Sequence, residues 1–327
     1  MILRKGDIML FEKQIVAVYQ KNMCARNDNA MGVFYFQPSH FEGLLFHPHV
    51  FQAKAGHELQ GYFYHYPNPI PGKLVVFEHG MGNGHRAYMR EIETLCKAGF
   101  LVFAYDHSGC MESGGAGTNG FAMSLSDLDD CITMLKGIQE IADRSICVVG
   151  HSWGGFSTMN IGALHPEITH LVAMSGFISV ERIVSQSFAG PLKGYRKRIM
   201  ELEAQMNPRY VHADAVRSLR DTKAKVLLIH SVDDPMVNIK MHFEELKTML
   251  GGMKNIRFLT LKGKFHNPTF ADEAVVYKDG FFKAFTKAQK KLATDEQKKA
   301  FMDGYNFWKM TEQDEKVWAE IIGHLNS

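Results

Sequence analysis

One stretch of the sequence decides the expected fold: Ser145-Ile146-Cys147-Val148-Val149-Gly150-His151-Ser152-Trp153-Gly154. The residues from 146 to 149 are apolar, as in a buried strand, and helical periodicity begins at Gly155. Between them stands the pattern G-x-S-x-G, which by itself also occurs in ordinary glycine turns. A serine on a sharp strand-to-helix turn needs strained backbone dihedrals and flanking residues without bulk. Because Gly150 and Gly154 supply that room, we predict that Ser152 is a nucleophile.

A serine hydroxyl becomes a nucleophile when a base takes its proton and an acid orients that base. In this topology the acid follows a later strand and the histidine follows the last one. Residues 225–230 predict a strand, and Asp233 and Asp234 come after it. Residues 256–261 predict the last strand, and His266 comes after that. A solvated loop histidine is the alternative, but its place in the chain order favours His266 as the base.

An acyl-transfer site also requires backbone N–H groups aimed at the developing oxyanion. The turn His79-Gly80-Met81-Gly82 directly follows an apolar run at 73–78 that predicts a buried strand. We predict that the N–H groups of Met81 and of Trp153, the residue after the nucleophile, form the oxyanion hole.

The sequence disfavours three other kinds of site: a dinucleotide site, a metal site and a reactive cysteine. A dinucleotide site would use the glycines after residue 78 and Asp106, but G-x-G-x-x-G requires a glycine where His85 stands. His47 and His49 could pair on a metal, yet no third ligand is near them, so a polar loop is the better interpretation. Cys110 lies in a glycine-rich loop and suits packing better than reactivity. We therefore expect no cofactor and no metal.

Short apolar runs alternate with helical patterns from about residue 57, which predicts a mostly parallel sheet with helices on both faces. We expect strands at 50–55, 59–66, 73–78, 101–105, 145–149, 170–174, 225–230 and 256–261. Residues 178–224 form a mostly helical insertion, predicted to cap one end of the sheet. Residues 1–44 and 290–327 are predicted helical extensions, with a capping box at Thr294-Asp295-Glu296-Gln297.

Composition excludes several classes of protein. The 327 residues would suit two domains by length, but single α/β domains also reach this size, and one domain over 1–327 is our prediction. Lys+Arg 37 against Asp+Glu 35 is too balanced for a protein that binds nucleic acid through phosphate neutralisation. We see no run of ~18 apolar residues for a membrane span and no signal peptide. Five cysteines without CxxC pairs favour reduced thiols and a cytoplasmic protein.

The insertion 178–224 carries nine basic and five acidic residues. Apolar side chains lie among these charges, namely Phe188, Leu192, Tyr195, Ile199, Met200 and Met206. Our hypothesis is an amphipathic roof whose apolar side forms an acyl pocket of limited depth and whose basic rim, including Arg196 and Arg198, tolerates anionic substrates. The alternative is an ordinary solvated helix face.

Together these motifs resemble the α/β-hydrolase superfamily over about residues 50–290, and most of all its lysophospholipase and serine-aminopeptidase branch. The motifs that carry the resemblance are 79–82, 105–109, 150–154, 230–234 and 263–267. It implies an α/β-hydrolase fold and a serine hydrolase that acts on esters or related acyl compounds through an acyl-enzyme. The predicted cap adds a helical insertion to this fold, and the roof hypothesis narrows the expected substrates to short to medium acyl esters. The resemblance also implies Asp234, rather than Asp233, as the acid of a triad with Ser152 and His266.

The expected partner is a small-molecule ester or acyl compound. An aminopeptidase, a thioesterase and an acyltransferase use the same triad and stay open as alternatives. A binding protein that keeps the fold without catalysis is less favoured, since nothing structural requires all three residues of the triad.

Overall fold

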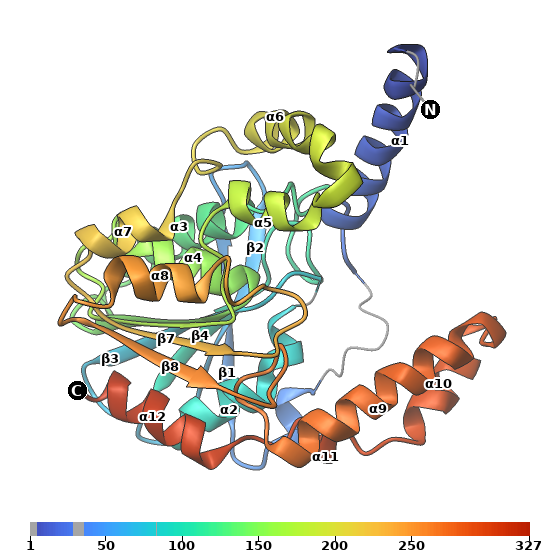
Figure 1. Cartoon of the computed structure of the whole chain (residues 1–327). Helices are drawn as coiled ribbons and strands as arrows, with labels where there is room; N and C mark the ends of the chain where they lie inside the picture. The colour runs from blue at the N-terminus through green and yellow to red at the C-terminus, as the bar shows by residue number, and fades with distance from the viewer. Residues whose placement is uncertain (1–4, 29–35, 83) are drawn as a thin grey trace.

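An eight-stranded, mostly parallel sheet forms the centre of the molecule (Figure 1). The computed structural model describes residues 5–28, 36–82 and 84–327. The strands are β1 (Leu45–Gln52), β2 (Glu58–His65), β3 (Lys73–Glu78), β4 (Leu101–Tyr105), β5 (Ser145–His151), β6 (His170–Met174), β7 (Lys225–Ser231) and β8 (Ile256–Leu261). Their order in the sheet is β1-β2-β4-β3-β5-β6-β7-β8. β2 pairs antiparallel with both of its neighbours, β1 and β4, and all pairs from β4 to β8 are parallel, which confirms the expected α/β fold.

Helices cover both faces of this sheet (Figure 1). On one face lie α3 (Met123–Lys136), α4 (Trp153–Ile161), α7 (Ala215–Asp221) and α8 (Phe243–Leu250), and on the other lie α2 (Met89–Lys97) and α12 (Glu315–Leu325). The remaining helices are α1 (Lys5–Met23), α5 (Val180–Ser187), the 3₁₀ helix η3 (Gly190–Tyr195), α6 (Arg196–Met206), α9 (Asp272–Ala288), α10 (Asp295–Asp303) and α11 (Phe307–Met310).

The core lies in two layers, one on each side of the sheet. Along β3, Leu74 and Val76 belong to one buried cluster, with α3 and α4, while Val75 and Phe77 belong to the other, with α2 and α12. Side chains alternate between the faces of a strand, so a strand covered on both faces needs apolar residues at every position. This explains why residues 74–77 of β3 are all apolar.

The chain order places a crevice beside β3. Its two neighbours, β4 and β5, lie on opposite sides of it, so the chain changes direction across the sheet at this point. In open α/β sheets, ligands bind beyond the carboxyl ends of the strands at such a switch point. The turns after β3 and β5, which begin at His79 and Ser152, are the ones that meet there.

The first strand corrects the sequence-based prediction. We expected a strand at 50–55, but β1 spans Leu45–Gln52. β1 is an edge strand whose side chains are mostly exposed, so its sequence lacks the apolar pattern of a buried strand and even includes Pro48. His47 and His49 therefore lie in a strand and not in a polar loop.

Residues 178–224 contain three α-helices and η3 between β6 and β7. Figure 1 shows α1 beside α6 and α5 at the same end of the molecule, although α1 ends at Met23 and α5 begins only at Val180. Helical structure in the predicted N-terminal extension 1–44 is limited, among the described residues, to α1 and a 3₁₀ turn at Pro38–His40.

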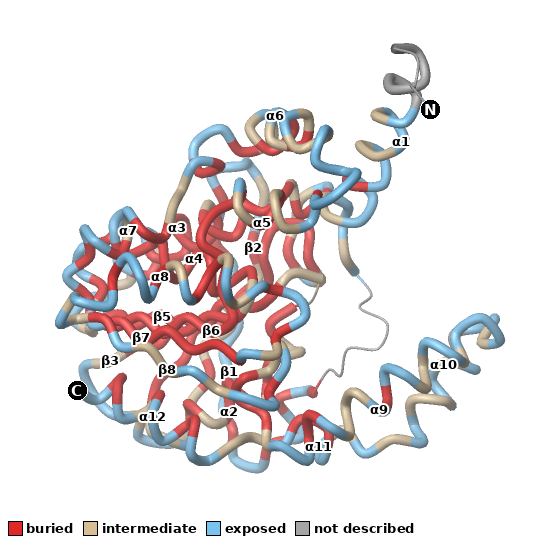
Figure 2. Tube along the Cα trace, in the orientation of Figure 1, coloured by how far each residue is buried: buried red, intermediate tan, exposed pale blue. Residues whose placement is uncertain are grey.

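The C-terminal region forms an arm and then returns to the body. α9 and α10 extend away from the sheet and are largely exposed, whereas α12 packs on it (Figure 2). The predicted capping box is confirmed, because the Gln297 N–H donates to Thr294 Oγ1 and the Gln297 side chain accepts from the Thr294 N–H. None of the helices within the described ranges combines the length and the apolar character that crossing a bilayer requires.

Candidate active site

Ser152 stands on a strained turn between β5 and α4. Its backbone has φ 57° and ψ −110°, a combination that L-residues rarely adopt. A Cβ on Gly150 would lie 2.2 Å from Thr158 Oγ1, and one on Gly154 would lie 2.3 Å from the carbonyl oxygen of Glu78. Glycine is therefore required at both positions, and the strained turn predicted from the sequence is confirmed.

His266 contacts one of the two candidate acids. Its Nδ1 lies 2.8 Å from Asp234 Oδ2, while Asp234 Oδ1 accepts the N–H groups of Met236 and Val237 at 2.8 and 3.0 Å. Burial alone would raise the pKa of Asp234, but these hydrogen bonds outweigh burial and leave the pKa below its usual value. Asp234 is thus ionised at neutral pH and holds the proton of His266 on Nδ1.

Asp233 has different partners. Its carboxylate accepts the backbone N–H groups of Gly263 and Phe265 at 2.9 and 3.3 Å and the hydroxyl of Ser231. These bonds fix the start of the loop that carries His266. Of the two neighbouring acids, Asp234 therefore contacts the imidazole and Asp233 binds the loop backbone.

A cavity of about 870 Å³ brings most of the predicted site together. Ser152, His266, Met81 and Trp153 all line it. Asp234 lies behind His266 with its side chain fully buried. The cavity sits at the carboxyl ends of the parallel strands, where the sheet order places the crevice.

Tyr88 and His151 connect the two sides of this site. The sequence indicated that His151, beside the nucleophile, shapes the pocket, but it did not single out Tyr88. His151 Nε2 lies 2.6 Å from the carbonyl oxygen of His266, so this nitrogen carries the proton and donates it. Burial and the nearby His266 lower the pKa of His151 to about 3, which keeps the ring neutral. Nδ1 must then accept from the Tyr88 hydroxyl at 2.9 Å, and that oxygen accepts the Gly80 N–H at 3.0 Å.

Glu91 and Lys278 form a polar part of the cavity wall, supplied by α2 and α9. Lys278 Nζ donates to Asn267 Oδ1 at 2.8 Å and lies 4.5 Å from the centroid of the Phe270 ring. Burial lowers the pKa of Lys278 to about 8 and raises the pKa of Glu91 to about 7. Both residues occupy ordinary positions on helices, so no local sequence pattern could have indicated them.

The predicted roof differs from the structure. Of the six apolar side chains expected to form it, only Phe188 and Leu192 line a cavity among those described, and it is not the catalytic one. Ile199 packs in the core instead. The guanidinium of Arg196 donates to two carbonyl oxygens at the end of α5, at 2.6 and 2.7 Å, and Arg198 pairs with neighbouring glutamates. These cations bind the protein itself and do not form a basic rim.

Asp106, His85 and Cys110, which were considered for other kinds of site, are bound or packed within the protein. Asp106 accepts the backbone N–H of the fully buried His85 at 2.8 Å, and its carboxylate also contacts the ring at 2.7 Å. Although burial acts to raise the pKa of Asp106, the contacts with His85 and the nearby His79 lower it to about 2. Cys110 is fully buried, in agreement with a packing role.

The sheet order and the turn at Ser152 define the α/β-hydrolase class, and comparisons with known proteins agree. A family model described as serine aminopeptidase matches residues 69–212. A monoacylglycerol lipase from Mycolicibacterium smegmatis is 30% identical over 115 residues, which are 34% of this chain and 39% of the lipase. The match therefore spans well under half of that relative's length.

Solved structures give the same fold. An esterase from Pyrococcus furiosus superposes with a TM-score of 0.60 at 21% identity, covering 81% of this chain and 98% of the esterase. An acylaminoacyl peptidase from Pyrococcus horikoshii superposes with a TM-score of 0.52 at 16% identity, covering 70% of this chain and 39% of the peptidase. The chain has the α/β-hydrolase fold, and its residues 69–212 are similar to the serine aminopeptidase family, in agreement with the sequence motifs.

Proposed function

We propose that the chain is a serine hydrolase that cleaves carboxylic esters of short to medium acyl chains, with Ser152, His266 and Asp234 as its triad. The observation that carries this proposal is the shared cavity, in which a serine on a strained turn and a histidine bonded to a buried carboxylate face the same space. The partial match to the serine aminopeptidase family and the esterase and lipase relatives support the same chemistry.

The proposed reaction has two stages. The Ser152 oxygen attacks the ester carbonyl while His266 Nε2 takes its proton, and Asp234 stabilises the imidazolium that forms. The N–H groups of Met81 and Trp153 bind the oxyanion until the C–O bond to the alcohol breaks and His266 returns the proton to the departing oxygen. Water, deprotonated by His266, then attacks the acyl-enzyme, releases the acid and restores Ser152.

An aminopeptidase on the same triad is the second candidate. The matched family is described as serine aminopeptidase, and the Glu91 carboxyl on the cavity wall could hold a substrate ammonium group. Thioesterase and acyltransferase activities would use the same acyl-enzyme with a different leaving group or acceptor.

A substrate panel with a matched pair of variants tests the proposal. Fluorophosphonate labelling and hydrolysis of p-nitrophenyl esters, monoacylglycerols and aminoacyl anilides would be measured for wild type, Ser152→Ala and Ser126→Ala. We expect Ser152→Ala to lose all labelling and to lower kcat by ~10⁴ or more, with Ser126→Ala unchanged. Anilides cleaved faster than every ester would favour the aminopeptidase. Label retained in Ser152→Ala would contradict the mechanism.

A cytoplasmic location is also part of the proposal. All five cysteines are free thiols, and four of them are buried. Unpaired thiols are typical of reducing compartments.

A further inference from the structure

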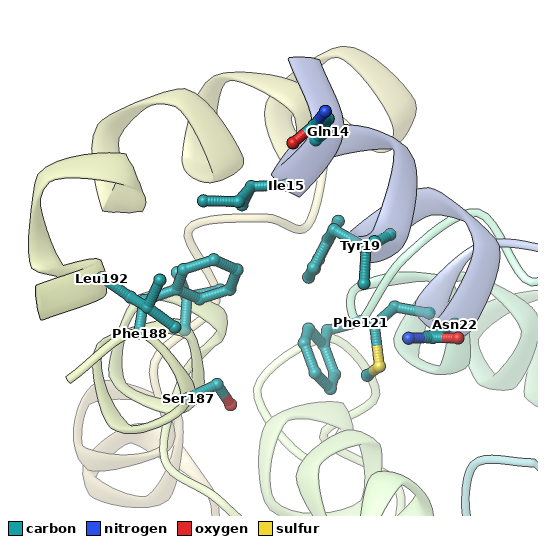
Figure 3. A pocket seen from close by; sticks show the side chains of 11 residues that line it. Gln14, Ile15, Tyr19, Asn22, Phe121, Ser187, Phe188 and Leu192 are labelled. Atoms are coloured by element: carbon teal, nitrogen blue, oxygen red, sulfur yellow. The ribbon is translucent and has the colours of Figure 1, made fainter. Parts of the chain in front are cut away.

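A second cavity of about 470 Å³ lies between α1 and the insertion 178–224. In Figure 3, Ile15 and Tyr19 of α1 stand opposite Phe188 and Leu192 of the insertion. The other residues of its wall are Gln14, Val18, Asn22, Met23, Phe121, Val184 and Ser187. Its volume lies within the range of about 300–1,000 Å³ that is usual for small-molecule pockets.

This second cavity adjoins the catalytic one. Asn22, Met23, Phe121 and Ser187 line both of them. Phe121 is also linked to the nucleophile turn, because its carbonyl oxygen accepts the indole N–H of Trp153 at 2.6 Å. A substrate held at Ser152 therefore has the second cavity as its neighbour.

The wall of the second cavity is mostly apolar. The hydroxyl of Tyr19, a polar group on this wall, is already bound to the carboxylate of Glu203. Val18 and Leu192 are 58% and 41% exposed, so the cavity presents apolar surface that an apolar ligand would cover. Burial of methylene groups against such surface is favourable by ~0.8 kcal/mol each, which corresponds to about fourfold in affinity.

Hydrogen bonds fix α1 in this position. Glu203 is fully buried on α6 and accepts both the Tyr19 hydroxyl and the Phe121 N–H, the latter at 2.9 Å. At the end of the helix, the carbonyl oxygen of Met23 accepts the Thr118 hydroxyl at 2.8 Å. These hydrogen bonds hold α1 in place as one wall of the second cavity.

We propose that the second cavity receives the acyl chain of the ester, so that α1 and the insertion together determine which chain length the enzyme prefers. This inference rests on the proposed esterase function. It places the acyl site in the second cavity, between α1 and the insertion, and not in a pocket formed by the insertion alone. It also predicts that medium-chain esters are preferred to acetate.

Narrowing the second cavity provides the test. kcat/KM would be measured for p-nitrophenyl acetate and p-nitrophenyl decanoate with wild type and Ile15→Trp. The added ring occupies space in the second cavity, so the decanoate-to-acetate ratio should fall at least tenfold while acetate hydrolysis is retained. Ala17→Trp, an exposed position on the same helix that does not line the cavity, is the matched control and should keep the wild-type ratio.

Leu192→Trp narrows the same cavity from the opposite wall at a partly exposed position that tolerates a larger side chain. An unchanged ratio in both Ile15→Trp and Leu192→Trp overturns the inference, as does an equal loss on both esters. Acetate hydrolysis that survives Ser152→Ala overturns the proposed function instead. If no ester is hydrolysed, calorimetric titration of decanoate tests the inference without the reaction. Decanoate should bind Ser152→Ala at least tenfold more tightly than it binds Ser152→Ala/Ile15→Trp, and equal affinities would overturn the inference.

Discussion

Asp233 and Asp234 are adjacent in the chain, yet their carboxylates act on different parts of the site. Asp234 contacts the ring of His266, and Asp233 holds backbone N–H groups of the loop on which His266 is carried. The identity of the acid could not be settled from the doubled sequence alone, because both residues follow the same strand. The contacts assign them separate tasks.

We predict that Asp234→Asn lowers kcat for p-nitrophenyl butyrate by ~10⁴, because the amide cannot fix the reactive tautomer or stabilise the imidazolium. Asp233→Asn should lower kcat far less and instead reduce the free energy of unfolding by about 1–3 kcal/mol, through weaker hydrogen bonds to the loop. Steady-state kinetics and urea denaturation of both variants measure these effects. A crippled kcat in Asp233→Asn with an active Asp234→Asn would show that the assignment is reversed.

The strained turn at Ser152 was predictable because its causes are local. Gly150 lies against α4 and Gly154 lies against Glu78 at the end of β3, so neither position admits a side chain, and the spacing of the two glycines in the sequence reflects this. Tyr88 and Lys278 were not predictable, because each is one residue on a helix whose partner lies elsewhere in the chain. Their contribution appears only when the helices are placed around the cavity.

At the level of elements, the apolar pattern of a strand decided whether the sequence could predict it. β3, β4, β6 and β8 have the expected bounds, while the exposed edge strand β1 was misplaced. The packing of α1 against the insertion was not predicted either. It depends on Glu203, the buried carboxyl of α6, and on an aromatic contact between Tyr19 and Phe188 with ring centroids 6.0 Å apart.

Glu203 predicts a pH dependence of stability. Burial raises its pKa from 4.5 to about 7, so the native state binds a proton between these values that the unfolded state has lost. Its contribution to stability is therefore complete below about pH 4.5 and falls as the pH rises to 7, by roughly 3 kcal/mol. Glu203→Gln should remove this fall, because a neutral amide carries no such burial cost.

Urea denaturation at pH 5 and pH 8 measures this prediction as the difference between the two free energies of unfolding. Glu201→Gln, an exposed change on the same helix, is the matched control and should keep the wild-type difference. An identical difference in wild type and Glu203→Gln would show that this carboxyl does not titrate between those pH values.

Across the whole molecule, the helical arm has an apolar cluster of its own. Phe281 of α9 is fully buried there and packs on rings of neighbouring arm residues, apart from the two layers beside the sheet. The arm and the sheet are thus expected to open separately. The sequence predicted helices in this region. It could not predict that α12 packs on the sheet, because that packing depends on which part of the sheet the other helices leave uncovered.

We predict that Phe281→Ala loosens the arm without loosening the sheet. Phe→Ala changes in cores cost about 3–5 kcal/mol, and here the loss falls on the contacts among α9, α10 and α11. Hydrogen–deuterium exchange should accelerate in residues 278–310 and stay unchanged in β3 to β7. Faster exchange in both regions would mean that arm and sheet form one cooperative unit.

The position of α1 in the chain has a consequence during synthesis. Its buried partner Glu203 lies 184 residues after Tyr19, so at about 5–20 residues per second the ribosome delivers it roughly 10–40 s later. A lone helix of 19 residues is marginally stable in water, and until then Tyr19 lacks the buried carboxylate that holds it in place. α1 is made well before its partner helix α6 and is thus among the last elements to settle. Through this interval the nascent chain exposes apolar side chains that a chaperone could bind.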